Sequence, residues 1–351
     1  MTCPEPDPER IAQWTLQLCQ QDSTTGHEAR LIPTLAGLLQ NLGARLLWQP
    51  VEGGRANLLA TWGEPKVLFT THLDTVPPYL PPRREGGRLW GRGTCDAKGI
   101  LATMLETIRL LLAEGRQGLA FLGVVGEETD SLGARLALEL QAHFPNLQGV
   151  INGEPTGNVL ATGQRGSAHL RLYCQGKAAH SGTPEEGINA AFPMLDWISE
   201  LRRLPQLEDP DLGPEVWNLG ILQAGRAINV VPDEAEVRLF ARTVKGSTFV
   251  EDVQRLRPDL GEVDVLFQRL PIVFPRLEGF PMAPVPFGSD AHTLGALVRD
   301  RFVVLTGPGS IRVAHTEDEH LDLDEAVAGA HQYLALARLI LERSQGPEYT
   351  I

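Results

Sequence analysis

The sequence has few cysteines, no long apolar run and no signal-peptide pattern at its start. Its four cysteines (Cys3, Cys19, Cys95 and Cys174) are scattered and form no Cys-x-x-Cys pair. This usage is typical of reduced thiols in a cytoplasmic protein. No stretch of about 18 apolar residues occurs, so no transmembrane helix is expected. The first residues also lack the basic region and apolar core of a signal peptide.

Positive charge is scarce as well. The chain carries 31 Lys and Arg against 44 Asp and Glu, which gives a net charge of −13. We therefore expect neither nucleic acid nor an anionic membrane as a partner. There is no tandem repeat and no low-complexity segment. A length of 351 residues with 42% hydrophobic residues fits one large globular domain or two smaller ones.

The chain is organised around a strand that ends in a histidine and an aspartate. Residues 66–71 read as a strand buried on both faces, because apolar or β-branched residues directly precede His72. In open α/β sheets, active sites lie at the carboxyl ends of strands. Alternate residues of an extended segment face the same way, so His72 and Asp74 can face one cleft. Asp74 would then hold the imidazole tautomer while His72 binds a metal.

Two later strands end in carboxylates in the same manner. Residues 118–126 form an apolar strand that runs into Glu127 and Glu128, and residues 149–152 are followed by Glu154. Adjacent glutamates in an extended segment face opposite ways and can take different roles. Imidazole and carboxylate ligands without cysteine suit Zn²⁺, Co²⁺ or Mn²⁺. The recurrence at one edge of a sheet predicts a metal site.

A glycine-rich run, residues 91–99, precedes a helix predicted for residues 99–114 and contains Asp96. A phosphate-binding loop requires Gly-Lys-Ser/Thr, but here Lys98 precedes Gly99, which argues against that function. We expect the glycines to allow close backbone approach to a site. Asp96 is then either a simple helix N-cap or a ligand at the helix entrance.

The pattern of elements changes after residue 162. The elements there follow the order β-α-β-β-α-β, which is typical of a ferredoxin-like domain. We therefore predict a discontinuous catalytic domain of residues 1–163 and 275–351, with an inserted domain of residues 164–274. Within the first domain, the strands at 56–62 and 66–71 are expected to be neighbours. The other elements expected are helices at 8–20, 27–43, 131–142, 187–204, 247–257 and 323–343, and strands at 165–175, 216–225, 234–243, 261–269 and 301–306.

Several motifs together resemble one family over nearly the whole chain. The chain is similar to the metallopeptidases and deacylases that include acetylornithine deacetylase, succinyl-diaminopimelate desuccinylase, aminoacylase and bacterial glutamate carboxypeptidase. The motifs are Thr-His-Leu-Asp-Thr-Val-Pro (71–77), Gly-Arg-Gly-Thr-Cys-Asp-Ala-Lys-Gly (91–99), Gly-Glu-Glu (126–128), Gly-Glu-Pro-Thr (153–156), Gly-Lys-Ala-Ala-His-Ser (176–181), Asn-Val-Val-Pro-Asp (229–233) and Ala-His-Thr-Glu-Asp-Glu (314–319).

The resemblance implies a fold, a ligand set and a general base. The fold is a zinc-peptidase-like α/β domain with a mixed, largely parallel sheet and helices on both faces, plus a ferredoxin-like dimerisation or lid domain. Two divalent metal ions, Zn²⁺ first, with Co²⁺ or Mn²⁺ as substitutes, would be bound by His72 and Glu154 and by Glu128 and His315. Asp96 would bridge both ions and precede a cis peptide bond, and Glu127 would be the general base.

The resemblance also implies residues that touch the substrate. His180 would reach the active site of a partner subunit and stabilise the oxyanion, which implies a homodimer. The remaining substrate-binding candidates are Arg165, Asn229, Arg242 and the backbone amides around Gly307 and Gly309. Residues 287–292, Phe-Gly-Ser-Asp-Ala-His, depart from the pattern of many relatives. His292 is either a ligand or a local hydrogen-bonding residue.

The function expected from these features is removal of an N-acyl group from a small-molecule amino acid. The most similar types are the acetylornithine, acetylcitrulline and acetyl-lysine deacetylases and the carrier-linked lysine hydrolases of arginine and lysine biosynthesis. An aminopeptidase, carboxypeptidase or dipeptidase is the alternative within the family. A catalytically inactive binding protein would lack one of the ligands, and none is missing. A two-metal phosphodiesterase would need phosphate-binding basic residues nearby, and only scattered arginines are visible.

Overall fold

The computed structural model describes residues 5–300 and 302–343, and Cys3 and Arg301 lie outside the described residues. The chain divides into two compact units. The first contains the chain up to Ala161, Phe274–Ala283 and the part from Ser289 onward, and the second contains Thr162–Val273 and Pro284–Gly288. The insertion predicted for residues 164–274 begins and ends within two residues of these borders, but the short segment Pro284–Gly288 also packs with the second unit.

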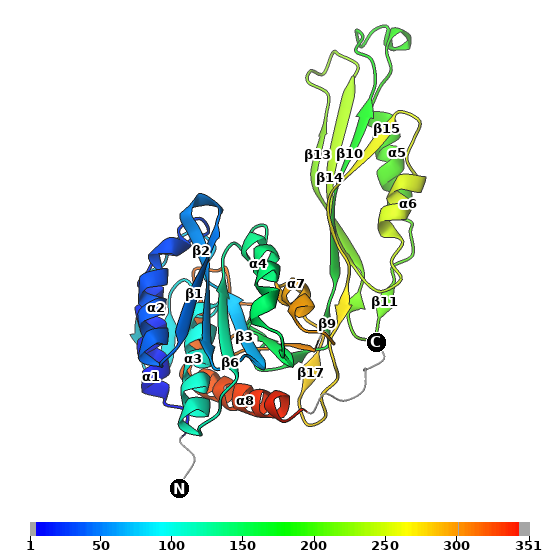
Figure 1. The fold of residues 1–351 in the computed structure, drawn as a ribbon. Helices are drawn as coiled ribbons and strands as arrows, with labels where there is room; N and C mark the ends of the chain where they lie inside the picture. Colours follow the sequence, from blue (N-terminus) through cyan, green and yellow to red (C-terminus); the bar gives the residue numbers. More distant parts are fainter. Residues whose placement is uncertain (1–4, 301, 344–351) are drawn as a thin grey trace. The chain divides into compact units, whose positions relative to one another are not determined.

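A six-stranded mixed sheet forms the centre of the first unit (Figure 1). Four strands are parallel to their neighbours, and two antiparallel strands complete one side. In spatial order they are β1 (Arg45–Val51), β2 (Arg55–Trp62), β6 (Leu119–Val124), β3 (Val67–His72), β7 (Gly149–Asn152) and β18 (Val303–Leu305).

The expectation that β2 and β3 are neighbours is wrong, because β6 lies between them. The chain leaves β3, passes through helix α3 (Lys98–Ala113) and returns as β6 parallel to β3. This crossover places β6 on the side of β3 that faces β2, where it pairs with both. Strands β6, β3 and β7 are therefore consecutive and parallel, and their carboxyl ends meet at one edge of the sheet.

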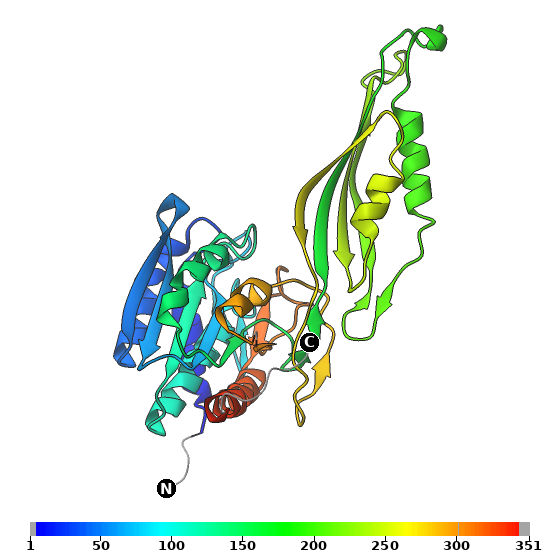
Figure 2. The same ribbon diagram turned by 45° about the vertical axis from the view of Figure 1, so that its right-hand side comes forward.

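Helices cover both faces of this sheet, as predicted (Figure 2). Helix α1 (Pro8–Cys19), α3 and α8 (Leu323–Glu342) pack against one another, and α3 and α8 contact β3. Helix α4 (Leu132–Ala137) and the short α7 (Ala291–Leu294) contact each other and sheet strands. All six residues of β3 and of β6 are buried, which explains their continuous apolar sequences.

Some predicted helices are shorter in the structure. The segment expected at 27–43 contains a 3₁₀ turn, Glu28–Arg30, and then helix α2 (Ile32–Asn41), which begins beside Pro33. The segment expected at 131–142 changes from α4 into a 3₁₀ helix at Leu138–His143. Helix α1 begins where predicted, because the Asp7 side chain accepts hydrogen bonds from the N–H groups of Glu9 and Arg10.

The second unit has the predicted ferredoxin-like order of elements and an antiparallel sheet in the order β13-β14-β10-β15. Strand β10 alternates between residues buried under the helices, such as Leu170, and residues of the opposite face, such as Arg171. Trp197 fills the core and donates to the Val253 carbonyl. The elements are β10 (Gly166–Gln175), α5 (Ala191–Leu201), β13 (Val216–Ala224), β14 (Glu234–Thr243), α6 (Phe249–Arg255) and β15 (Gly261–Arg269).

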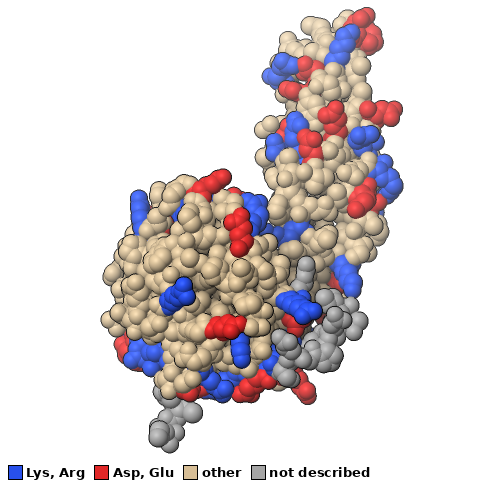
Figure 3. All heavy atoms as spheres, viewed as in Figure 1, with Lys and Arg blue, Asp and Glu red and all other residues tan. Residues whose placement is uncertain are grey.

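The hydrophobicity of the helices and the distribution of surface charge agree with the amino-acid composition. None of the helices in the described ranges is long and apolar enough to cross a membrane. Basic and acidic side chains are interspersed over the face drawn in Figure 3.

Candidate metal centre

His72 is the last residue of β3, and both of its ring nitrogens have partners. Nδ1 lies 2.9 Å from the backbone oxygen of Asp74, and Nε2 lies 2.9 Å from Asp96 Oδ1. The Asp74 carboxylate is farther away, with Oδ1 at 3.5 Å from Nδ1. The Nδ1 proton therefore points mainly at a carbonyl, which leaves Nε2 free to act as a ligand.

The Asp74 carboxylate instead organises the segment that follows β6. It accepts hydrogen bonds from the backbone N–H groups of Glu127 at 3.1 Å and Glu128 at 3.2 Å. The hydroxyl of Thr25 donates a third bond at 2.9 Å. Asp74 thus links the end of β3 to both glutamates. Thr25 was not singled out in the sequence, because only the tertiary structure brings the 23–26 loop to this point.

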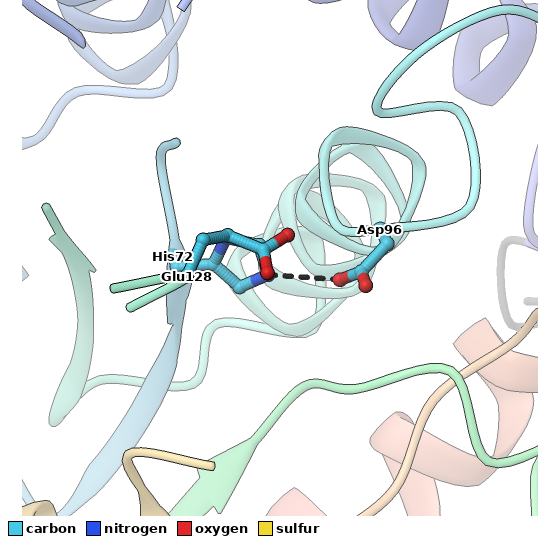
Figure 4. A group of neighbouring side chains, drawn as sticks. All are labelled: His72, Asp96 and Glu128. Carbon is cyan, nitrogen blue, oxygen red and sulfur yellow. Dashed lines mark hydrogen bonds and ion pairs between the residues drawn. The ribbon is translucent and has the colours of Figure 1, made fainter. Parts of the chain in front are cut away.

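Asp96 lies at the entrance of α3, between two histidines. Its Oδ1 faces His72 Nε2 at 2.9 Å (Figure 4). Its Oδ2 faces His315 Nε2 at 3.3 Å. The peptide bond between Asp96 and Ala97 is cis, which confirms that expectation. The N-cap of α3 is Ala97, with no side-chain capping bond, so the alternative of Asp96 as an N-cap is wrong.

Glu128 and His315 complete the group. His315 Nε2 lies 3.0 Å from Glu128 Oε1. One ligand atom each from His72, Asp96 and Glu128 lies within 4.8 Å of the others, a spacing that is compatible with metal binding at this point. His315 comes from the segment after β18, more than 180 residues away in sequence, and its backbone has a positive φ of 64°.

Glu127 and Glu154 lie close to this group and have raised pKa values. Burial raises the pKa of Glu154 well above its usual range, and the charge of Glu127 raises it further. Burial also raises the pKa of Glu127, and the next contribution comes from Asp290. Asp290 is a fully buried carboxyl group in the unusual 287–292 segment, and sequence reasoning did not assign it a role.

Both histidines have raised pKa values because carboxylates lie beside them. Hydrogen bonds with Asp96 and Glu128 raise the pKa of His315 to about 10. Burial lowers the pKa of His72, but hydrogen bonds with Asp74 and Asp96 outweigh it and the pKa is raised. Acidic groups thus outnumber basic ones in a largely buried cluster. Such an excess of carboxylates favours bound cations, and the imidazole and carboxylate donors fit Zn²⁺, Co²⁺ or Mn²⁺.

His180 and Asn229 lie together in the second unit. His180 forms an isolated β-bridge with Val230, and the Ser181 N–H donates to the Asn229 carbonyl at 3.0 Å. Both residues are exposed. Their loops follow the end of β10 and precede the start of β14, so both lie at one end of the sheet.

Arg165 and Arg242 lie at the opposite end of the same sheet. Arg165 directly precedes β10 and donates to the carbonyls of Pro214 and Pro286. Arg242 is near the end of β14, and its guanidinium lies over the ring of Phe240 at 4.8 Å. Burial lowers the pKa of Arg242, and the positive charges of Arg165 and Arg269 lower it further. The substrate-binding residues predicted in the second unit thus form two separate groups.

The remaining candidates lie in the first unit. The Gly307 N–H already donates to Thr156 Oγ1 at 3.1 Å, and the Gly309 carbonyl accepts from Gly157 N at 2.7 Å. Their role in substrate binding stays a prediction. His292 lies in helix α7 and is partly buried. Its role also stays a prediction.

Comparison with known proteins agrees with this geometry. The model of peptidase family M20/M25/M40 matches residues 68–339. A peptidase M20 domain-containing protein of Schizosaccharomyces pombe is 32% identical over 344 residues, which cover 90% of this chain and 81% of the relative. A probable carboxypeptidase of Aspergillus clavatus is 32% identical over 364 residues, with coverage of 92% and 86%.

Solved structures show the same fold. A tripeptidase of Staphylococcus aureus superposes with a TM-score of 0.82 at 23% identity, covering 97% of this chain and 100% of that one. An M20 family metallo-carboxypeptidase of Sulfolobus solfataricus gives 0.74 at 15% identity, with coverage of 94% and 99%. The chain therefore belongs to peptidase family M20/M25/M40 and is a metal-dependent hydrolase of amide bonds.

Proposed function

We propose that the protein hydrolyses the amide bond on the α-nitrogen of an amino acid whose α-carboxylate is free, with two divalent metal ions. The observation that carries this proposal is the position of Asp96. Each of its two carboxylate oxygens faces the Nε2 atom of a different histidine. A carboxylate with this environment can bridge two ions, each held by one imidazole.

Zn²⁺ is the first choice of metal, and the residues divide into two sets around Asp96. His72 and Glu154 would hold one ion, and His315 and Glu128 would hold the other. Two such ions supply polarisation of the substrate carbonyl and a water of lowered pKa. The Asp74 carboxylate keeps Glu127 and Glu128 in place through their backbone N–H groups.

Glu127 is the proposed general base. It directly precedes the ligand Glu128 and is left without a metal in this assignment. A carboxylate that binds no metal can accept a proton from a nearby water. Glu127 would take the proton of the attacking water and deliver it to the nitrogen of the leaving amine.

Arg242 is the proposed partner of the substrate carboxylate. It is partly buried, and the charges of Arg165 and Arg269 act on it, so a bound anion would relieve the repulsion. A guanidinium can hold a carboxylate through two parallel hydrogen bonds.

The separation of the two groups in the second unit supports a homodimer. Strand β10 has ten residues, which at roughly 3.3 Å each separate its ends by about 30 Å. One small substrate cannot touch His180 and Asn229 at one end and Arg242 at the other. We propose that His180 and Asn229 serve the active site of a second copy of the chain.

The free, buried thiols of Cys19, Cys95 and Cys174 support a reducing, cytoplasmic location.

Two substrate classes share the proposed chemistry. The first is an N-acyl amino acid such as N-acetylornithine, N-acetylcitrulline, N-acetyl-lysine or a carrier-linked lysine. The second is a short peptide that loses its carboxy-terminal residue, and the relatives named as probable carboxypeptidases favour it. In both classes the leaving group is an amino acid with a free carboxylate.

The test is amine release from a panel of N-acetyl and N-succinyl amino acids and dipeptides. Wild type, Glu127→Gln and the matched exposed control Glu139→Gln would be assayed with and without added Zn²⁺. Metal-dependent turnover that is lost only in Glu127→Gln is expected. Turnover of dipeptides alone would favour the peptide class over the N-acyl amino acids. No turnover of either class, or full activity in Glu127→Gln, would contradict the proposal.

A further inference from the structure

A buried ion pair outside the proposed ligand set connects the segments that carry the ligands. Arg92 is 2% exposed and Glu319 is fully buried, and Arg92 Nη1 lies 2.5 Å from Glu319 Oε2. Neither side chain belongs to the proposed ligands or the general base. Burying a charged pair carries a large desolvation cost, so a pair at this position calls for an explanation beyond stability.

The Glu319 carboxylate holds the loop that presents Asp96. Its Oε1 accepts three backbone N–H bonds, from Gly93 at 2.8 Å and from Cys95 and Asp96 at 3.1 Å. The Glu319 carbonyl also accepts the Gly91 N–H at 3.0 Å. One residue thus fixes most of the backbone of the loop between Gly91 and Asp96.

The Arg92 side chain extends the connection to the other ligand segments. Its Nε donates to the Pro78 carbonyl at 3.2 Å, in the loop that follows His72 and Asp74. Its Nη1 donates to the Thr316 carbonyl at 3.3 Å, directly after His315. The pair therefore joins the segments that carry His72, Asp96 and His315.

We propose that Arg92 and Glu319 are positioning residues that hold Asp96 between His72 and His315 at the separation required for two metal ions. This inference rests on the proposed function only in taking these three residues as metal ligands. Because the pair already orders the loop between Gly91 and Asp96, Zn²⁺ binding does not have to bear the free-energy cost of ordering it. Loss of the pair is therefore expected to weaken Zn²⁺ binding. The expected loss of Zn²⁺ affinity is about 10- to 100-fold, the range typical of residues that orient ligands.

The test compares Glu319→Gln and Arg92→Met with a matched control. Glu106 is also fully buried, pairs with Arg10 and Arg109, and accepts a backbone N–H from Asp7 at 3.0 Å, but it lies along α3 away from the ligands. Glu106→Gln therefore removes an equivalent buried charge. Zn²⁺ affinity would be measured by competition with a chromophoric chelator. The unfolding midpoint in urea and amide exchange of residues 91–97 would be measured on metal-free protein.

Weaker Zn²⁺ binding and faster exchange of residues 91–97 are expected in Glu319→Gln and Arg92→Met. In Glu106→Gln the Zn²⁺ affinity should stay within about twofold of wild type, even if its unfolding midpoint falls as far as that of Glu319→Gln. Wild-type affinity in Glu319→Gln, or an equal loss in Glu106→Gln, would overturn the inference while leaving the proposed function intact. A wild-type protein that binds no Zn²⁺ would instead overturn the proposed function and this inference together.

Discussion

Replacing Asp74 by asparagine tests whether this carboxylate organises the metal centre. The ionised group accepts from the N–H groups of Glu127 and Glu128 and from the Thr25 hydroxyl. Burial raises the pKa of Asp74, but the contacts with His72 lower it overall, so the group is charged at neutral pH. Asparagine keeps the shape but has only one acceptor oxygen.

The magnitude follows from the bonds that asparagine cannot make. If its oxygen takes the place of Oδ2, Glu128 and Thr25 keep their acceptor and the Glu127 N–H faces an NH₂ group. One bond to a charged acceptor is lost and one N–H is left without a partner, which costs about 1–3 kcal/mol. The general base then loses its backbone support, so kcat/KM should fall about 10- to 100-fold.

The assay is urea unfolding of metal-free protein together with kcat/KM of the Zn²⁺-loaded enzyme. Asp130→Asn is the matched control, because Asp130 is exposed and accepts the Leu132 N–H at 3.0 Å in the same turn. This control should stay close to wild type in both measurements. If Asp74→Asn also retains wild-type unfolding free energy and kcat/KM, the reasoning about Asp74 is refuted.

Three further results are expected. Removal of metal by a chelator should abolish activity and lower the melting temperature, because ions that bind only the folded state stabilise it, and added Zn²⁺ should restore both; an unchanged melting curve would contradict this. Gly133→Ala should destabilise the protein by about 1–3 kcal/mol in urea unfolding, since its Cβ would lie 2.4 Å from the Val125 oxygen, whereas Gly37→Ala, with open space in helix α2, should stabilise it by about 0.5–1 kcal/mol. Burial raises the pKa of Cys19 to about 12, so at pH 8.5 iodoacetamide should label it in the unfolded chain and leave it unlabelled in the native protein, as followed by peptide mass spectrometry.

The sequence predicted the strands that carry the site, because each is a short apolar run with polar residues directly after it. Strands β3, β6 and β7 are buried on both faces, which makes this pattern strong. Strand β1 was missed, since Arg45–Val51 is a partly exposed edge strand that contains Pro50. The order of β2, β6 and β3 was wrong because strand neighbours depend on a crossover that local patterns do not reveal.

The motifs allowed the metal ligands to be predicted. They did not reveal the residues that hold those ligands in position. His72, Asp96, Glu128 and His315 come together as expected. Arg92 and Glu319 stand inside recognised motifs, but their burial against each other becomes visible only when segments more than 220 residues apart meet. Thr25 lies in a segment without a motif. Asp290 lies within residues 287–292, where only His292 was a candidate.

The most direct test of the two-metal centre is the metal content of the protein after loading with Zn²⁺ and dialysis, measured by elemental analysis. About two zinc ions per chain are expected in wild type, and about one in Glu154→Gln, which removes a ligand of one ion only. The exposed control Glu139→Gln should match wild type. A wild-type chain that retains no zinc, or a Glu154→Gln chain that retains as much as wild type, would contradict the assignment of this centre.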